Sequence, residues 1–117
     1  MIALAKKTDN QILESVEPLI ECMLAGSTER NHEKHVTDFT DRLKVIVTID
    51  NLAQQCEDYQ SHVGYFKKRE FVAVFRRQLS VAVVWRLFFT KSDDEFVLEA
   101  VFVEKEDALK IDHCMIY

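Results

Sequence analysis

The sequence is poor in the residues that interrupt regular structure, with two glycines and one proline among 117 residues. These residues form most turns and flexible linkers, so their scarcity leaves little room for long loops. Apolar residues make up 48% and charged residues 30%, a mixture typical of folded globular proteins. We therefore expect one domain over residues 1–117, with most of the chain in helices and strands.

Other absences exclude classes of function. No stretch approaches the roughly 18 apolar residues of a membrane-spanning helix. The N-terminal segment MIALAKK reaches charged residues too early for the core of a secretory signal. The 15 basic and 20 acidic residues give a net charge of −5, which argues against binding a polyanion. We expect a cytoplasmic protein with no membrane partner and no nucleic-acid partner.

Motifs for redox or metal chemistry are also missing. Cys22, Cys56 and Cys114 form no C-x-x-C pair and are typical of buried apolar side chains in a reducing compartment. His32 and His35 are close enough to share a helix face, but a metal site needs three or four convergent ligands. We expect no metal and no cofactor.

The first half of the chain has helical spacing. Thr8 and Gln11 fit a capping box, which predicts a helix starting there. One apolar stripe follows at Ile12, Leu13, Val16, Leu19, Ile20, Met23 and Leu24. We expect this helix to bend near Pro18 and to end at Gly26, because glycine readily adopts the left-handed conformation found at helix ends.

Two further helices are expected before Gly64. The apolar side of the second consists of Val36, Phe39, Leu43, Ile46 and Val47. Thr48 can cap the third, and Gly64 can end it. Its apolar side carries Leu52, Cys56, Tyr59 and Val63.

After Gly64 the apolar spacing changes to every second residue, which predicts strands. We expect strands over 66–77, 79–89, 96–103 and 109–117, with turns at 92–94 and 104–107. Helices followed by hairpins predict an α+β fold, with three N-terminal helices packed on a curved four-stranded antiparallel sheet. The residues expected to face the helices are Leu79, Val81, Val83, Trp85, Leu98, Phe102, Ile111 and Met115.

The opposite face of the predicted sheet is more apolar than a solvated face usually is. Its apolar members would be Val84, Phe88, Val97, Val101, Val103 and Ile116, beside Arg86, Glu99 and Asp112. Patches of this kind mark contact surfaces. We expect a homodimer formed through Val84, Phe88, Val101 and Val103, and an adaptor that binds another protein there is the alternative.

Several segments resemble one known superfamily. They are VEPLIECMLAG at 16–26, FTDRLKVIVTIDNL at 39–52, the joint Gly64-Tyr65-Phe66 and the closing hairpins. Together, over residues 9–117, they resemble the nuclear transport factor 2-like superfamily, the cystatin-like α+β cone, and most of all its small uncharacterised stand-alone domains. The resemblance implies a cone that opens between helices and concave sheet and often dimerises through the sheet. The superfamily holds isomerases, dehydratases and hydrolases as well as association domains without chemistry, and none of their catalytic motifs aligns with this chain.

His113 is the strongest candidate for chemistry. Strict alternation places it beside Ile111 and Met115 on the apolar face, where a histidine is tunable as a general acid or base. A pocket for a small apolar ligand would be lined by Tyr59, Phe75, Trp85, Leu98 and His113. The plainer interpretation is that the aromatic residues fill the core and that His113 is a hydrogen-bonded core residue. The leading hypothesis is a ligand-binding homodimer without chemistry, and an isomerase, dehydratase or hydrolase that uses His113 is the alternative.

Overall fold

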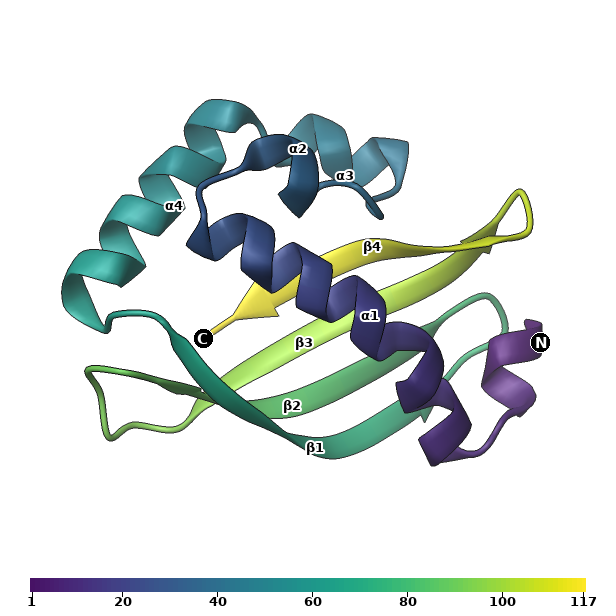
Figure 1. The fold of residues 1–117 in the computed structure, drawn as a ribbon. Helices are drawn as coiled ribbons and strands as arrows, with labels where there is room; N and C mark the ends of the chain where they lie inside the picture. Colours follow the sequence, from purple (N-terminus) through teal and green to yellow (C-terminus); the bar gives the residue numbers. More distant parts are fainter.

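The computed structural model describes all residues 1–117. A short 3-10 turn, η1 (Ala3–Lys6), precedes four helices: α1 (Asp9–Thr28), α2 (His32–His35), α3 (Asp41–Ile46) and α4 (Ile49–His62). Four strands follow: β1 (Phe66–Arg76), β2 (Val81–Phe89), β3 (Phe96–Lys105) and β4 (Ala108–Ile116). Each strand pairs antiparallel with the next, in the order β1-β2-β3-β4, and the helices cover one face of the curved sheet (Figure 1). The predicted α+β architecture is confirmed, with four helices in place of three.

Helix α1 begins as predicted and ends later than predicted. The Thr8 capping box is present, and the helix runs on through Pro18 to Thr28 without a break. Arg30 holds the left-handed conformation with φ 55°, and Asn31 N donates to Gly26 O at 2.8 Å, as in a Schellman motif. The prediction that Gly26 ends the helix was wrong.

Gly26 serves a close approach between two segments. A Cβ atom built on Gly26 would lie 2.4 Å from the backbone nitrogen of His35 and 2.6 Å from its Cα. Only a residue without a side chain lets the end of α1 and the end of α2 pack this tightly. Gly26 therefore fixes where His35 lies.

The second predicted helix is divided into α2 and α3 by a segment that joins the sheet. Phe39 forms a parallel bridge with Ile111 of β4. Thr40 N donates to Ile111 O at 2.9 Å, and Ile111 N donates to Asp38 O at 2.7 Å. Backbone groups that pair with a strand are not free for helical bonds, so the helix stops there. As predicted, Thr48 caps α4 and Gly64, with φ 86°, follows its end.

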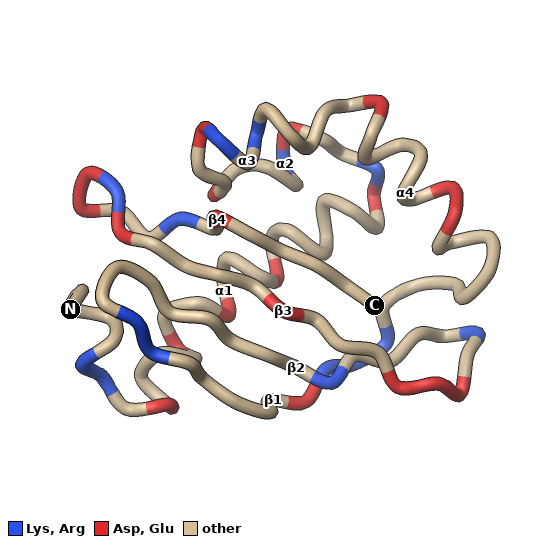
Figure 2. Tube along the Cα trace, turned by 180° about the vertical axis from the view of Figure 1, so that it is seen from behind, with Lys and Arg blue, Asp and Glu red and all other residues tan.

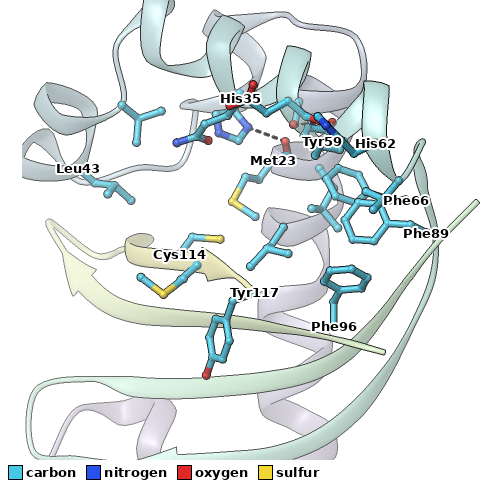
Figure 3. Close-up of a pocket in the computed structure, with 18 of the residues that line it drawn as sticks. Met23, His35, Leu43, Tyr59, His62, Phe66, Phe89, Phe96, Cys114 and Tyr117 are labelled. Carbon is cyan, nitrogen blue, oxygen red and sulfur yellow. Dashed lines mark hydrogen bonds between the residues drawn. The ribbon is translucent and has the colours of Figure 1, made fainter. Parts of the chain in front are cut away.

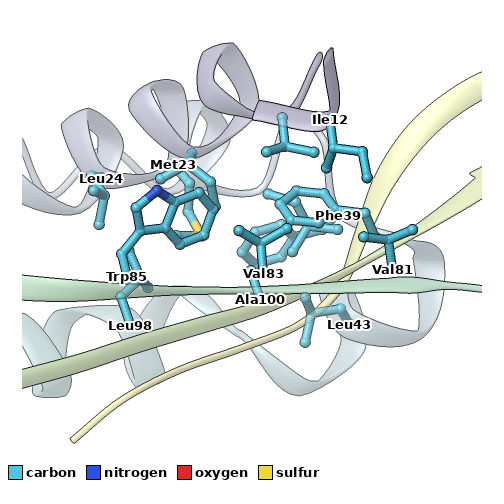
Figure 4. Packing of buried hydrophobic residues seen from close by; sticks show 14 of the residues in the cluster. Ile12, Met23, Leu24, Phe39, Leu43, Val81, Val83, Trp85, Leu98 and Ala100 are labelled. Carbon is cyan, nitrogen blue, oxygen red and sulfur yellow. The ribbon is translucent and has the colours of Figure 1, made fainter. Parts of the chain in front are cut away.

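The core lies between α1 and the concave face of the sheet. Trp85 is 1% exposed, and its indole Nε1 donates to Glu17 Oε1 of α1 at 3.0 Å. Figure 4 shows Trp85 of β2 beside Met23 and Leu24 of α1. The predicted inward faces of β2 and β3 are confirmed at Val81, Val83, Trp85, Leu98 and Phe102. Leu79 lies instead in the turn before β2 and is 78% exposed.

A bulge at Val72 reverses the alternation along β1. Phe71 pairs with Trp85, but the next paired residue is Ala73, opposite Val84. Past the bulge, Val74 points to the helices and Phe75, opposite Ala82, points to the other side of the sheet, called the outer face from here on. Phe75, predicted to line the pocket, therefore lies on the wrong face for it. Each inserted residue moves the later side chains to the opposite face, and β1 has an earlier register shift between Phe66 and Lys68 as well.

A bulge at Asp112 does the same in β4. Phe102 pairs with Ile111, and Val101 pairs with His113. Asp112 accepts hydrogen bonds from Thr40 Oγ1 at 2.8 Å and from Arg42 Nε at 3.2 Å, which tie the bulge to the helical layer. His113 consequently lies on the outer face. The later residues are reversed as well: Cys114 and Ile116 point to the helices, and Met115, predicted to point inward, is 50% exposed.

Candidate functional site

A cavity of about 630 Å³ lies at the end of the sheet where β1 and β3 begin and β2 and β4 end. The helical layer closes it from the other side, with α4, α3 and the last turns of α1 (Figure 3). Of its 19 lining residues, 14 are hydrophobic. This size and composition are those of a site for a small, largely apolar molecule.

One wall of the cavity is a cluster of four aromatic rings. Tyr59 of α4 stacks on Phe66 of β1 with ring centroids 5.1 Å apart. Phe66 contacts Phe89 at 5.3 Å, and Phe89 meets Phe96 edge to face at 4.9 Å. Because these rings come from one helix and three strands, they hold the wall rigid.

The interior and the rim differ in character. The interior includes the buried side chains Met23, Leu24, Phe39, Leu43 and Phe89. The exposed residues Gln55, Asp58, His62, Met115 and Tyr117 form the rim. No lysine or arginine lines the cavity, so a ligand carboxylate would find no charged partner. The lining therefore disfavours an anion, and its one carboxylate, Asp58, lies on the exposed rim.

Tyr59 takes part in a chain of hydrogen bonds that links α4 to the end of α1. Its hydroxyl lies 2.9 Å from Ser27 Oγ and accepts from Gln60 Nε2 at 3.1 Å. Cys56 Sγ donates to the Ser27 carbonyl at 3.2 Å. Burial raises the pKa of Tyr59, which keeps the phenol protonated at neutral pH. These groups satisfy one another within the protein.

His35 lines the cavity from the end of α2. Its Nδ1 lies 2.8 Å from the Met23 carbonyl, drawn as a dashed line in Figure 3, and its ring meets Phe39 edge to face at 5.2 Å. Burial lowers the pKa of His35, outweighing the opposing effect of this hydrogen bond. The imidazole is therefore neutral at pH 7.

Cys114 lies on the cavity wall and carries a neutral thiol. Burial raises its pKa to about 12, and the Glu99 carboxylate adds to the effect. A nucleophilic cysteine needs the opposite shift, so Cys114 serves here as an apolar lining group. His113 precedes it in sequence but points to the outer face.

Of the five residues predicted for the pocket, the structure places one on the cavity wall, Tyr59. Trp85 and Leu98 face the helices but are buried in the core under α1, outside the cavity lining. Phe75 and His113 lie on the outer face for the reasons given above. There His113 Nε2 is 3.0 Å from Glu99 Oε2, so the two form a pair on the face of the sheet opposite the cavity.

His32 and His35 do not converge on a common point. His32 Nε2 donates to the Val47 carbonyl at 2.8 Å, whereas His35 bonds to Met23. Elsewhere in the chain no group of three His, Cys, Asp or Glu side chains is arranged to hold a metal ion.

The four residues predicted for dimerisation all lie on the outer face. Val84, Phe88, Val101 and Val103 are partly exposed there and alternate with the buried residues of β2 and β3. Seen from that side, β2 and β3 carry few charged residues (Figure 2). The charges present are paired, as in Arg86 with Glu70 and Glu95.

A second, wider groove lies at the other end of the sheet. Only five of its 14 lining residues are hydrophobic. Its charged residues are of both signs: Arg42, Lys44, Lys105 and Lys110 with Asp41, Glu104, Glu106 and Asp112. With no excess of one charge and little apolar lining, it offers a ligand less than the aromatic-walled cavity does.

None of the helices combines the length and the apolar character that crossing a bilayer requires. No protein-family model matches the sequence, and no curated protein matches it either.

Solved structures with the same arrangement of helices and sheet include two that superpose with a TM-score above 0.5. A candidate calcium/calmodulin-dependent protein kinase type II association domain from Thiobacillus denitrificans superposes with a TM-score of 0.60 at 13% identity, over 86% of this chain and 91% of that one. Bd1075 from Bdellovibrio bacteriovorus gives 0.53 at 15% identity, over 88% of this chain but only 39% of its own length. A DUF4783 family protein from Bacteroides uniformis gives 0.48 at 15% identity, over 82% of this chain and 93% of that one. The fold is thus of the nuclear transport factor 2-like type, and membership of that superfamily stays a prediction.

Proposed function

We propose that this protein binds a neutral, largely apolar small molecule in the cavity between α4 and the end of the sheet. The observation that carries the proposal is the cavity itself, about 630 Å³ with 14 hydrophobic residues among its 19 lining residues. The cavity opens to solvent at its rim, and an apolar concave surface left open to water is typical of a contact or ligand site. A space of this size, walled by aromatic rings, is the usual form of a ligand site.

Catalysis finds less support than binding. The histidine expected to act as a general acid or base, His113, lies on the face opposite the cavity. The thiol that does reach the cavity, Cys114, is held neutral. Within the cavity Tyr59 has its hydrogen bonds inside the protein. A nucleophile with an adjacent base is thus absent from the lining, which favours a binding role over covalent chemistry.

The test is a titration with N-phenylnaphthylamine, a neutral probe whose fluorescence rises in apolar surroundings. We expect saturable binding that Val47→Trp weakens at least about tenfold, because Val47 lines the cavity and an indole there occupies it. Val45→Trp is the matched control, since Val45 is 78% exposed and outside the lining. Equal binding by both variants would show that the probe sits elsewhere, and an absence of saturable binding to the wild type would refute the proposal.

We further propose that two copies associate through their outer faces. Four strands about 4.8 Å apart, with nine residues of about 3.3 Å each in β2, give a face of about 19 by 30 Å. That is about 570 Å² per copy, near the lower end of specific interfaces. A second copy suits this face better than an unrelated partner, because the apolar residues of β2 and β3 on one copy would then meet the same apolar residues on the other. The Thiobacillus denitrificans neighbour, described as an association domain, is consistent with such a role.

A face of this size supports a weak dimer. We expect size-exclusion chromatography with light scattering to show a monomer–dimer equilibrium that shifts with protein concentration. A mass equal to one chain up to millimolar concentration would refute the second proposal and leave the first untouched.

A further inference from the structure

The polar groups of the cavity differ in whether their hydrogen bonds are already made. The Tyr59 hydroxyl accepts from Gln60 and is paired with Ser27, and Gln60 Oε1 in turn accepts from Arg30 Nε at 3.0 Å. All of these hydrogen bonds are made within the protein, so these groups do not need a hydrogen bond from a ligand. Among the polar groups of the interior, which leaves aside the exposed rim residue His62, His35 is the exception.

The hydrogen bond of His35 determines which of its nitrogens carries the proton. The Met23 carbonyl can only accept, so the bond at 2.8 Å requires a proton on Nδ1. In the neutral ring the other nitrogen, Nε2, then bears a free lone pair. Nε2 has no hydrogen-bond partner in the protein. Unlike Arg69 Nε, which is buried without a partner, it is not cut off from solvent. It is therefore accessible, on a ring that lines the cavity.

The ring has little freedom to turn away from this orientation. On one side it packs edge to face against Phe39. Its Nδ1 is held on the Met23 carbonyl at 2.8 Å, and the backbone of His35 is packed against Gly26, which fixes the point from which the ring projects. A fixed acceptor in apolar surroundings discriminates strongly between ligands that can donate a hydrogen bond and ligands that cannot. A ligand without a donor leaves the acceptor without a hydrogen bond, which lowers the affinity.

We infer that the ligand carries a hydroxyl or N–H group on an apolar body, and that this group donates a hydrogen bond to Nε2 of His35. The inference rests on the proposed binding function and specifies its ligand class. It excludes anionic ligands, which have no cationic partner in the cavity, and it disfavours ligands whose polar atoms only accept. Small apolar alcohols, phenols and heteroaromatic N–H compounds are the class that fits.

Three planar molecules of one shape test this directly: carbazole has a bridging N–H, fluorene a CH₂ and dibenzofuran an oxygen that only accepts. We expect the wild type to bind all three and to favour carbazole. In His35→Asn the shorter amide keeps a donor near the Met23 carbonyl but removes the acceptor at Nε2. The preference for carbazole over fluorene should then fall about 3- to 10-fold, the effect of one neutral hydrogen bond, while fluorene affinity is retained.

Glu33→Gln is the matched control, because Glu33 lies in the same helix as His35, is exposed and does not line the cavity. It should leave the carbazole preference unchanged. If the wild type binds none of the three molecules, the cavity proposal fails and this inference fails with it. If it binds them but shows the same preference in His35→Asn, or prefers dibenzofuran, the role of His35 is overturned while the binding function stands.

Discussion

Two opposite effects on stability are expected when Gly26 is replaced by alanine, and the measurement decides between them. Gly26 lies inside α1, two residues before its end at Thr28, and helix propensity alone predicts that alanine there stabilises the fold by about 1 kcal/mol. The tertiary contact predicts the reverse. The new Cβ would lie 2.4 Å from the His35 nitrogen, whereas carbon atoms in contact are normally about 3.5–4.0 Å apart.

The contact is more than an ångström too short, and the atoms it meets belong to the backbone, which cannot rotate away. Overpacking of this kind costs about 1–3 kcal/mol, and we place this case in the upper part of the range. After subtraction of the propensity gain, we expect Gly26→Ala to lower the free energy of unfolding by about 1–2 kcal/mol. For a chain of 117 residues that is a fall in Tm of about 4–8 °C.

Urea unfolding followed by Trp85 fluorescence measures this change, because Trp85 is the one tryptophan and is buried under α1. Thr28→Ala is the control: it also improves helix propensity in α1, but Thr28 is exposed, so it should be neutral or slightly stabilising. An increase in stability for Gly26→Ala would refute the argument that close packing of α1 on His35 requires glycine.

Two further predictions concern protonation and association. Burial lowers the pKa of His35, so on acidification the unfolded chain takes up a proton at this residue before the folded chain does. The contribution of the neutral His35 to the free energy of unfolding is therefore complete above the ordinary pKa of about 6.5 and decreases as the pH falls below it. Urea midpoints at pH 7.5 and pH 5.5 should therefore differ more in the wild type than in His35→Asn, and equal differences would contradict a buried neutral His35. Val101→Asp puts a charge at the centre of the outer face and should abolish any dimer seen by light scattering, whereas Gln54→Glu on the exposed side of α4 should not; a dimer that survives Val101→Asp would exclude this face.

The sequence was sufficient for the architecture because local signals and spacing agreed along most of the chain. The capping residues Thr8 and Thr48 lie where the spacing begins to be helical, and the change to two-residue spacing follows Gly64. The faces of β2 and β3 followed directly, since neither strand has a bulge in its pairing with the other.

The candidate site was harder to predict because two bulges decide its composition. A bulge at Asp112 is held by Thr40 and Arg42, which lie about 70 residues earlier in the chain, so alternation along β4 gives no sign of it. It exchanged His113 for Cys114 on the inner face, as the bulge at Val72 moved Phe75 outward.

One part of the cavity did have a signal in the sequence. Phe66, Phe89 and Phe96 stand at the start of one strand, the end of the next and the start of the third, and in an antiparallel meander these positions meet at the same end of the sheet. His35 had no such signal, because its role depends on the tertiary contact with Gly26 and on the Met23 carbonyl.

The bulge in β1 also bears on how the molecule avoids self-assembly into fibres. β1 is an edge strand of 11 residues, and a straight edge of that length invites lateral pairing by another chain. The extra residue at Val72 breaks the regular ladder near its middle, and the exposed Lys67 and Lys68 add charge to the edge. The bulge at Val72 thus makes the open edge of the sheet a poorer template for pairing with further chains.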